Sequence, residues 1–221
     1  MTKNEVYDML KKFLGYGNPN SKYWFIGMEE NWDISCCKDI TKIIAKKDIE
    51  YYSKEVQSLI DNEEILCQFT NRAERRNTFE RGIKEILEKI EKKELDKILQ
   101  ADIFFATNIR FMPIRDYNKI KEFFNNKDIP VYEEDEKDRR KRLFELWRSN
   151  QHNERITFCL SKTKDYVKYF KELFNNEIEF IISKDKRIGA AEYNGKKIYL
   201  LDHPSAFGYF NKCINELENI F

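Results

Sequence analysis

Four short runs of apolar, β-branched and aromatic residues stand out in an otherwise polar chain. The runs are Tyr23–Gly27, Ile103–Thr107, Ile156–Leu160 and Ile198–Leu201. Each is too short for a helix and is typical of a strand buried on both faces. Sequence with helical periodicity separates the runs, as in βαβ units. We therefore predict an α/β fold with three layers, α/β/α, around a central, mainly parallel four-stranded sheet.

Apolar residues at helical spacing place the helices between these strands. One stripe precedes the first strand and another precedes the second, and Ser161 and Ser205 are each placed to cap a helix that follows a later strand. The stripes are Val6, Met9, Leu10 and Phe13; Ile83, Ile86, Leu87 and Ile90; Val167, Phe170 and Phe174; and Ile214 and Leu217.

Two stretches, Asp33–Leu66 and Asn125–Asn150, add to this scheme. The second contains EEDEKDRRKRLFELWR, which predicts a solvated helix with one apolar edge, and the arginine clusters at 72–76 and 139–142 are interpreted as solvated faces. Residues Ile178–Ser183 predict an added strand, and Asn194-Gly195 predicts the turn of a hairpin before the last strand. No repeat or linker divides the chain, so we expect one domain over residues 1–221.

Composition narrows the setting without indicating a function. A chain of 221 residues that is 41% hydrophobic can bury a sizeable core, and no run approaches a membrane span or a signal peptide. We expect an intracellular, cytoplasmic monomer. Five cysteines without a CxxC pair indicate reduced thiols rather than disulfides or a zinc site. The net charge of +1 requires any DNA contact to come from a local patch.

Polar residues follow the predicted strands at the points where ligands gather in open parallel sheets. The first strand leads into Met28-Glu29-Glu30-Asn31, the second into Asn108, and the last into Asp202-His203-Pro204-Ser205. The carboxyl ends of parallel strands share one edge of a sheet. The sequence therefore predicts a site that combines a carboxylate, an amide and an imidazole.

Three segments with this order and spacing resemble the uracil-DNA glycosylase superfamily. GNPNSKYWFIGMEE resembles the superfamily's lead into a strand that ends in a glycine-acid loop, FFATNIRFMPIR resembles the second-strand segment of its thermophilic-type branch, and LLDHPSAFGYF resembles its closing HPS motif. Together they span nearly the whole chain. The resemblance implies a DNA base glycosylase, which flips a base out of DNA and hydrolyses its N-glycosidic bond to leave an abasic site.

The chemistry of that reaction distributes the roles. The Asn108 amide offers a donor and an acceptor to a pyrimidine edge, and the resemblance implies the same base-reading role. The His203 imidazole can donate to the base oxygen as negative charge develops. A carboxylate, Glu29 ahead of the adjacent Glu30, can orient water near the sugar. Together with Asn108, the substrate-binding set comprises Gly27, Met28, Asn31 and Ser205.

Contacts with DNA are expected around the same edge. Ser205 opens a helix whose free N–H groups suit a phosphate. Phe207 or Tyr209 is a candidate wedge for the minor groove, and a place in the core is an equal alternative for both. The candidate basic contacts are Arg110, Arg115, Lys162 and Lys164. His152, in a polar stretch, is assigned to the surface.

Two departures from the superfamily bear on cofactor and substrate. The thermophilic-type branches hold an iron–sulfur cluster with a close cysteine pair near the N-terminus, and no cysteine precedes Cys36 here. We therefore predict neither a metal nor another cofactor. The uracil enzymes place a tyrosine two residues after the catalytic acid, where it blocks bulky bases, and Asn31 stands there. The base, uracil or a modified pyrimidine, stays open.

Two alternatives remain. The irregular GMEEN loop is compatible with an inactive protein of the same fold that binds nucleic acid or a nucleotide. A generic α/β nucleotide-binding or interaction module is the other alternative, although the chain has no glycine-rich phosphate loop.

Overall fold

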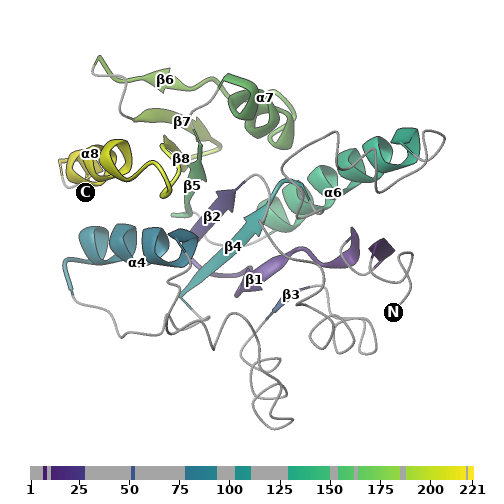
Figure 1. Cartoon of the computed structure of the whole chain (residues 1–221), viewed down its shortest axis with the longest axis horizontal. Helices are drawn as coiled ribbons and strands as arrows, with labels where there is room; N and C mark the ends of the chain where they lie inside the picture. The colour runs from purple at the N-terminus through teal and green to yellow at the C-terminus, as the bar shows by residue number, and fades with distance from the viewer. Residues whose placement is uncertain are drawn as a thin grey trace, which may run out of the picture.

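The four apolar runs form the four central strands of one sheet. The computed structural model describes residues 7–8, 11–27, 51–52, 78–93, 103–110, 129–149, 154–161, 164–184, 188–217 and 219–221. Strands β4 (Phe104–Asn108), β2 (Tyr23–Gly27), β5 (Ile156–Leu160) and β8 (Lys196–Leu201) lie side by side in that order, and all are parallel (Figure 1). The predicted α/β class is confirmed. The observed strands start or end within two residues of the predicted runs.

The sheet is larger than expected, because the described residues form eight strands and the sheet is mixed. Strand β1 (Gly15–Gly17) runs antiparallel to β4, and β3 (Tyr51–Tyr52) pairs with β1 in parallel. At the other edge, β7 (Gly189–Tyr193) and β6 (Ile181–Ile182) continue the sheet in antiparallel fashion. A four-stranded sheet was therefore too small a prediction.

The local sequence explains both extensions. Gly15 permits the close approach of β1, because a side-chain Cβ there would lie 2.5 Å from the Ala106 carbonyl oxygen. The predicted Asn194-Gly195 turn joins β7 to β8, with φ of 49° and 80°, the left-handed pair that two-residue hairpins require. The added strand is shorter than the predicted Ile178–Ser183, because only Ile181 and Ile182 pair.

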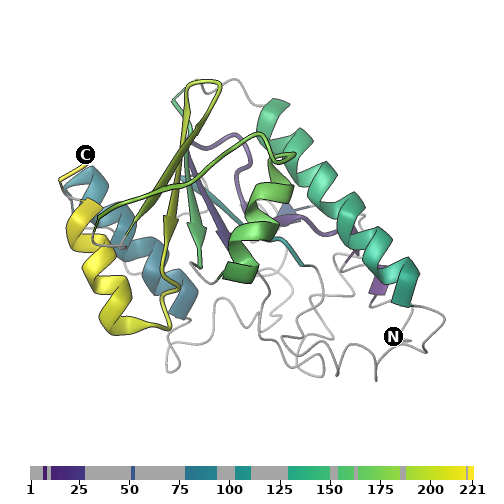
Figure 2. The ribbon, with the colours of Figure 1, turned by 90° about the horizontal axis from the view of Figure 1, so that it is seen from above.

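Helices cover both faces of the sheet, as Figure 2 shows. Helices α4 (Thr78–Glu91) and α8 (Phe207–Leu217) lie over one face, where Ile83, Ile86 and Leu87 join the buried core as predicted. Helices α6 (Ile129–Ser149) and α7 (Lys164–Leu173) lie over the other face and form a second core. Of the predicted N-terminal stripe, Phe13 is buried, and the other three residues lie outside the described part.

Helix α6 departs from the solvated helix that the sequence predicted. Its buried stripe begins with polar residues and ends with apolar ones, and the buried charged members are Asp135, Glu136, Arg139 and Arg140. The interpretation of residues 139–142 as a solvated face was therefore wrong for Arg139 and Arg140. Both lie on the same helical face as the apolar residues one turn later, so burial follows from position on the helix. The cluster at 72–76 lies outside the described residues.

Candidate functional site

The chain connections single out one point along the carboxyl edge of the sheet. Helix α4, the described helix between β2 and β4, lies over one face, whereas α7 follows β5 on the opposite face, and β2 and β5 are neighbours. Adjacent parallel strands whose connections leave on opposite faces form a topological switch point, where ligands bind in doubly wound sheets. The sequence-predicted residues flank this point, with Asn108 at the end of β4 on one side and His203 after β8 on the other.

Gly27 and Asn108 lie next to each other at this edge. They are partners in the parallel register of β2 and β4, and the Ile109 N–H donates to the Gly27 carbonyl at 3.0 Å. Asn108 is 9% exposed, and its side-chain amide makes no hydrogen bond with another described residue. Strand alternation places it on the same face as Phe104 and Ala106, toward α4 and α8. An amide at this edge that is not bonded to another described side chain is suited to a ligand.

The His203–Ser205 turn fixes the state of the imidazole. The Ser205 backbone N–H donates to His203 Nδ1 at 3.1 Å, and the Ser205 hydroxyl oxygen lies 2.7 Å from the same nitrogen. Because a backbone N–H can only donate, this geometry makes Nδ1 the acceptor. A neutral imidazole in this geometry carries its proton on Nε2. The turn presents His203 as a hydrogen-bond donor.

Ser205 does not cap α8 as the sequence predicted. The carbonyl of Ala206 accepts the first helical bonds, from the N–H groups of Tyr209 and Phe210, so Ala206 is the N-cap residue. The Ser205 hydroxyl contacts His203 instead. The sequence alone could not show whether the Ser205 hydroxyl contacts the His203 ring or a backbone N–H at the start of α8, because both lie within a few residues of Ser205.

Two contacts anchor this turn to the helices beneath it. Pro204 is buried against α4 at Gly82, where a Cβ would lie 2.4 Å from the Pro204 ring. The Cys213 thiol of α8 lies 3.4 Å from the Asp202 carboxylate. Because Gly82 has no side chain, Pro204 packs closely on α4, and this contact holds the turn that carries His203.

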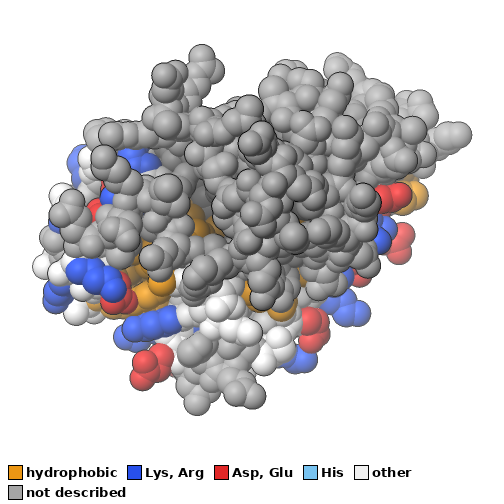
Figure 3. Space-filling view, turned by 90° about the horizontal axis from the view of Figure 1, so that it is seen from below, with side chains coloured by type: hydrophobic (Ala, Val, Ile, Leu, Met, Phe, Trp, Pro, Cys, Tyr) orange, Lys and Arg blue, Asp and Glu red, His pale blue; other side chains and the backbone are white. Residues whose placement is uncertain are grey.

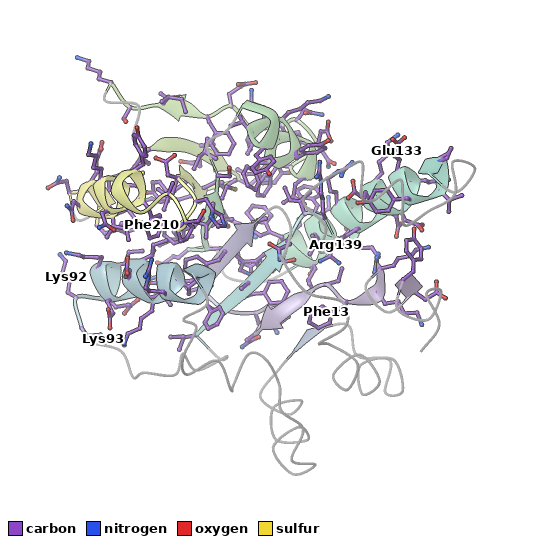
Figure 4. The ribbon with its side chains drawn as sticks, in the orientation of Figure 1. Phe13, Lys92, Lys93, Glu133, Arg139 and Phe210 are labelled. Atoms are coloured by element: carbon purple, nitrogen blue, oxygen red, sulfur yellow. The ribbon has the colours of Figure 1, made fainter. Side chains whose placement is uncertain are left out.

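A buried arginine holds the other side of the site, and sequence reasoning missed it. Arg139 of α6 reaches the end of β4 and the segment before β1, where Figure 4 labels it near Phe13. Its Nε–H donates to the Asn108 carbonyl at 3.0 Å, and its terminal nitrogens donate to the carbonyls of Leu14, at 3.2 Å, and Phe13. The Thr107 hydroxyl also donates to Leu14. Arg139 therefore fixes the backbone from which the Asn108 amide projects.

Most of the remaining predicted residues cannot be placed. The alternative acid Glu30 lies outside the described residues, and so do Met28, Glu29, Asn31, Arg115 and Lys162. Phe207 and Lys164 begin α8 and α7, and their side chains are not described. Tyr209 is 68% exposed beside Lys212, so the alternative that placed it in the core was wrong.

Arg110 turns toward α6 and α7 rather than outward. Its Nη2 lies 3.5 Å from the Tyr169 hydroxyl, and its Nε lies 3.9 Å from Glu136. Burial raises the pKa of the Glu136 carboxyl, whereas the Tyr132 hydroxyl and the arginines Arg110, Arg140 and Arg139 oppose that shift. The predicted site therefore borders a buried network of charged side chains.

The described surface adds three observations. Basic and acidic side chains are interspersed where Figure 3 shows them.

Among the described residues, no group of three or more histidine, cysteine, aspartate or glutamate side chains is placed to hold a metal ion. No helix in the same part of the chain is both long and apolar enough to cross a membrane.

Comparison with known proteins gives no match: no protein-family model, no curated protein and no solved structure matches this chain.

Proposed function

We propose that this protein is a DNA base glycosylase, which flips a uracil or modified pyrimidine out of DNA and hydrolyses its N-glycosidic bond. The proposal includes a fold of the uracil-DNA glycosylase type, with β4, β2, β5 and β8 as its central parallel strands. Its partner would be DNA that contains an altered base. The observation that carries the proposal is the position of Asn108, which is 9% exposed and lies beside Gly27 at the carboxyl edge of the sheet.

The spacing of the strands supports a ring-sized ligand between Asn108 and His203. Three strand spacings separate β4 from β8, or about 14 Å at the usual distance between neighbouring strands. The Asn108 side chain and the His203 turn lie on the same side of the sheet, because the turn packs on α4 through Pro204. A pyrimidine over the ends of β2 and β5 would lie between an amide and an imidazole.

The protonation state of His203 suits the proposed chemistry. As the glycosidic bond breaks, negative charge appears on the leaving base, and a donor aimed at the base oxygen stabilises that charge mainly in the transition state. The Ser205 N–H keeps Nδ1 as the acceptor, so Nε2–H is the donor without any change of tautomer. In this mechanism Asn108 reads the base edge, and Glu29 or Glu30 orients the attacking water.

The test uses labelled oligonucleotides that contain uracil, thymine opposite guanine, or a 5-modified cytosine, followed by alkali to cleave abasic sites. We expect product from at least one base. We expect His203→Ala to lower the turnover by about 100-fold to 1,000-fold, the usual effect of removing one such donor. Asn108→Ala should lower activity and blur the discrimination among bases.

The matched control is His152→Ala, which removes the chain's other imidazole and should leave activity unchanged. Glu29→Gln and Glu30→Gln, tested separately, identify the acid. If folded protein shifts the mobility of DNA but none of the three bases yields an abasic product, the proposal is wrong. The inactive nucleic-acid-binding alternative then holds.

A further inference from the structure

A second polar cluster lies beside the proposed site, where Arg110, Arg140 and Tyr169 meet from three elements. Arg110 follows β4, Arg140 belongs to α6, and Tyr169 belongs to α7. The guanidinium carbons of Arg110 and Arg140 lie 5.2 Å and 5.6 Å from the centre of the Tyr169 ring. Two cations therefore share one aromatic ring, and Arg110 lies only two residues from Asn108.

The protein uses the hydrogen-bonding capacity of Arg140 only in part. Arg140 is 8% exposed, and its Nη1 is buried without a hydrogen-bond partner. The nearest acids are distant, with Glu136 Oε2 at 3.9 Å from Nη1 and Glu172 Oε2 at 3.5 Å from Nη2. Both distances exceed the usual range for a charged hydrogen bond. Buried donors in native proteins normally find partners, so an unpaired one is available to a ligand.

The acids that face Arg140 are also shared with other groups. Glu136 faces both Arg110 and Arg140 at 3.9 Å while it accepts a hydrogen bond from the Tyr132 hydroxyl. Glu172 is shared with Lys168, whose Nζ lies 3.9 Å away. Neither acid therefore serves Arg140 alone.

We propose that Arg110 and Arg140 bind a phosphate group beside the Asn108 edge of the sheet, with the Tyr169 hydroxyl as an additional donor. Guanidinium groups suit phosphate because their planar donors engage two oxygens at once. The side chains of Arg110 and Arg140 keep 13% and 10% of their surface exposed, so the site remains in contact with solvent. The assignment of this phosphate to a DNA backbone rests on the proposed function. The phosphate site itself does not.

The first experiment titrates inorganic phosphate into the intact chain and follows the arginine side-chain N–H signals by NMR. We expect saturable shifts for Arg110 and Arg140, which Arg140→Gln and Arg110→Gln each abolish. The control is Arg148→Gln, on the same helix but exposed and paired with Glu145. Because Arg140 is buried, its variant can fail to fold, so Arg110→Gln and Tyr169→Phe provide the second test. Tyr169→Phe should weaken phosphate binding measurably, but less than Arg110→Gln.

The second experiment measures affinity for a single-stranded uracil oligonucleotide over a range of salt concentrations. Loss of one phosphate contact should lower the slope of log K against log salt by about 0.7 in Arg110→Gln and in Arg140→Gln. Binding of inorganic phosphate with an unchanged DNA slope assigns the site to free phosphate instead. If phosphate shifts neither arginine and the slope is unchanged, the phosphate site is wrong. If the protein is an active glycosylase but the slope is unchanged and phosphate does not bind, the phosphate site is rejected and the proposed function stands. If phosphate binds but no abasic product forms, the proposed function is rejected and the phosphate site stands.

Discussion

The two halves of α6 bury the same helical face with opposite chemistry. Toward the C-terminus, Leu143, Phe144 and Trp147 pack into the apolar core over the sheet. Toward the N-terminus, buried charged residues occupy the same stripe, and they lie where α6 meets the carboxyl ends of the strands. Apolar burial stabilises the fold through area removed from water, whereas buried charges need specific partners. The charged half of α6 therefore depends on specific partners from other segments, such as the Asn108 carbonyl, in a way that the apolar half does not.

The largest expected effect is in the apolar half. Trp147 packs against Phe174 with ring centres 4.9 Å apart and donates from Nε1 to the Thr157 hydroxyl at 2.9 Å. Trp147→Ala leaves a cavity and should lower the free energy of unfolding by about 4 kcal/mol. Urea denaturation measures this change. The neighbouring exposed Arg148→Ala should change it by less than about 0.5 kcal/mol, and an equal loss in both variants would contradict the assignment of the apolar half to stability.

The next effect is in the charged half and is local. Arg139→Ala leaves the carbonyls of Asn108, Phe13 and Leu14 without this donor. We expect the free energy of unfolding to fall by about 3 kcal/mol, because buried polar groups without partners are costly. Hydrogen exchange should accelerate at the end of β4 more than in the apolar half of α6. Arg139→Lys should restore part of the loss. Uniform acceleration across the chain would show that Arg139 does not act locally on the Asn108 backbone.

The smallest effect is a dependence on pH. Burial raises the pKa of Glu136 above its usual 4.5, so above pH 4.5 the folded state holds a proton that the unfolded state loses. The stability contributed by this group is complete below pH 4.5 and is lost as the pH rises through the folded-state pKa. Between pH 4.5 and the folded-state pKa of Glu136, the free energy of unfolding should fall less in Glu136→Gln than in the wild type. Denaturation at several pH values measures this difference. Glu134→Gln, at an exposed position of α6, should leave it unchanged. An identical slope in the wild type and Glu136→Gln would contradict this account.

Some features of the charged half were visible in the sequence but were not used. Tyr132, Glu136, Arg139 and Leu143 follow one another at steps of three or four residues, the same periodicity that identified the apolar stripes. Acids precede arginines by four residues, which allows partial neutralisation on one face. Charge content alone suggested a solvated helix. The periodicity was the better signal, because position on a helix decides burial before residue type does.

The candidate site shows a similar division. Strand ends in the sequence identified Asn108 and His203, and their placement on one edge follows from the parallel order of β4, β2, β5 and β8. Helical periodicity places Arg139 on the buried face of α6 but does not identify its hydrogen-bond partners, which lie more than 30 residues away along the chain. Nor did it indicate the Gly82–Pro204 contact, because both residues have ordinary local explanations.

The sequence by itself determined the four central strands, the apolar stripes of α4, α7 and α8, and the Asn194-Gly195 turn, because these depend on periodicity and local backbone preference over a few residues. The tertiary structure alone decided that β1 and β3 extend the sheet, that β2 and β5 meet at a switch point, that Ser205 contacts His203 rather than capping α8, and which groups pair with the buried Arg139. Each of these depends on partners supplied by distant segments. A charged side chain can be buried only where such partners exist, and no local pattern specifies them.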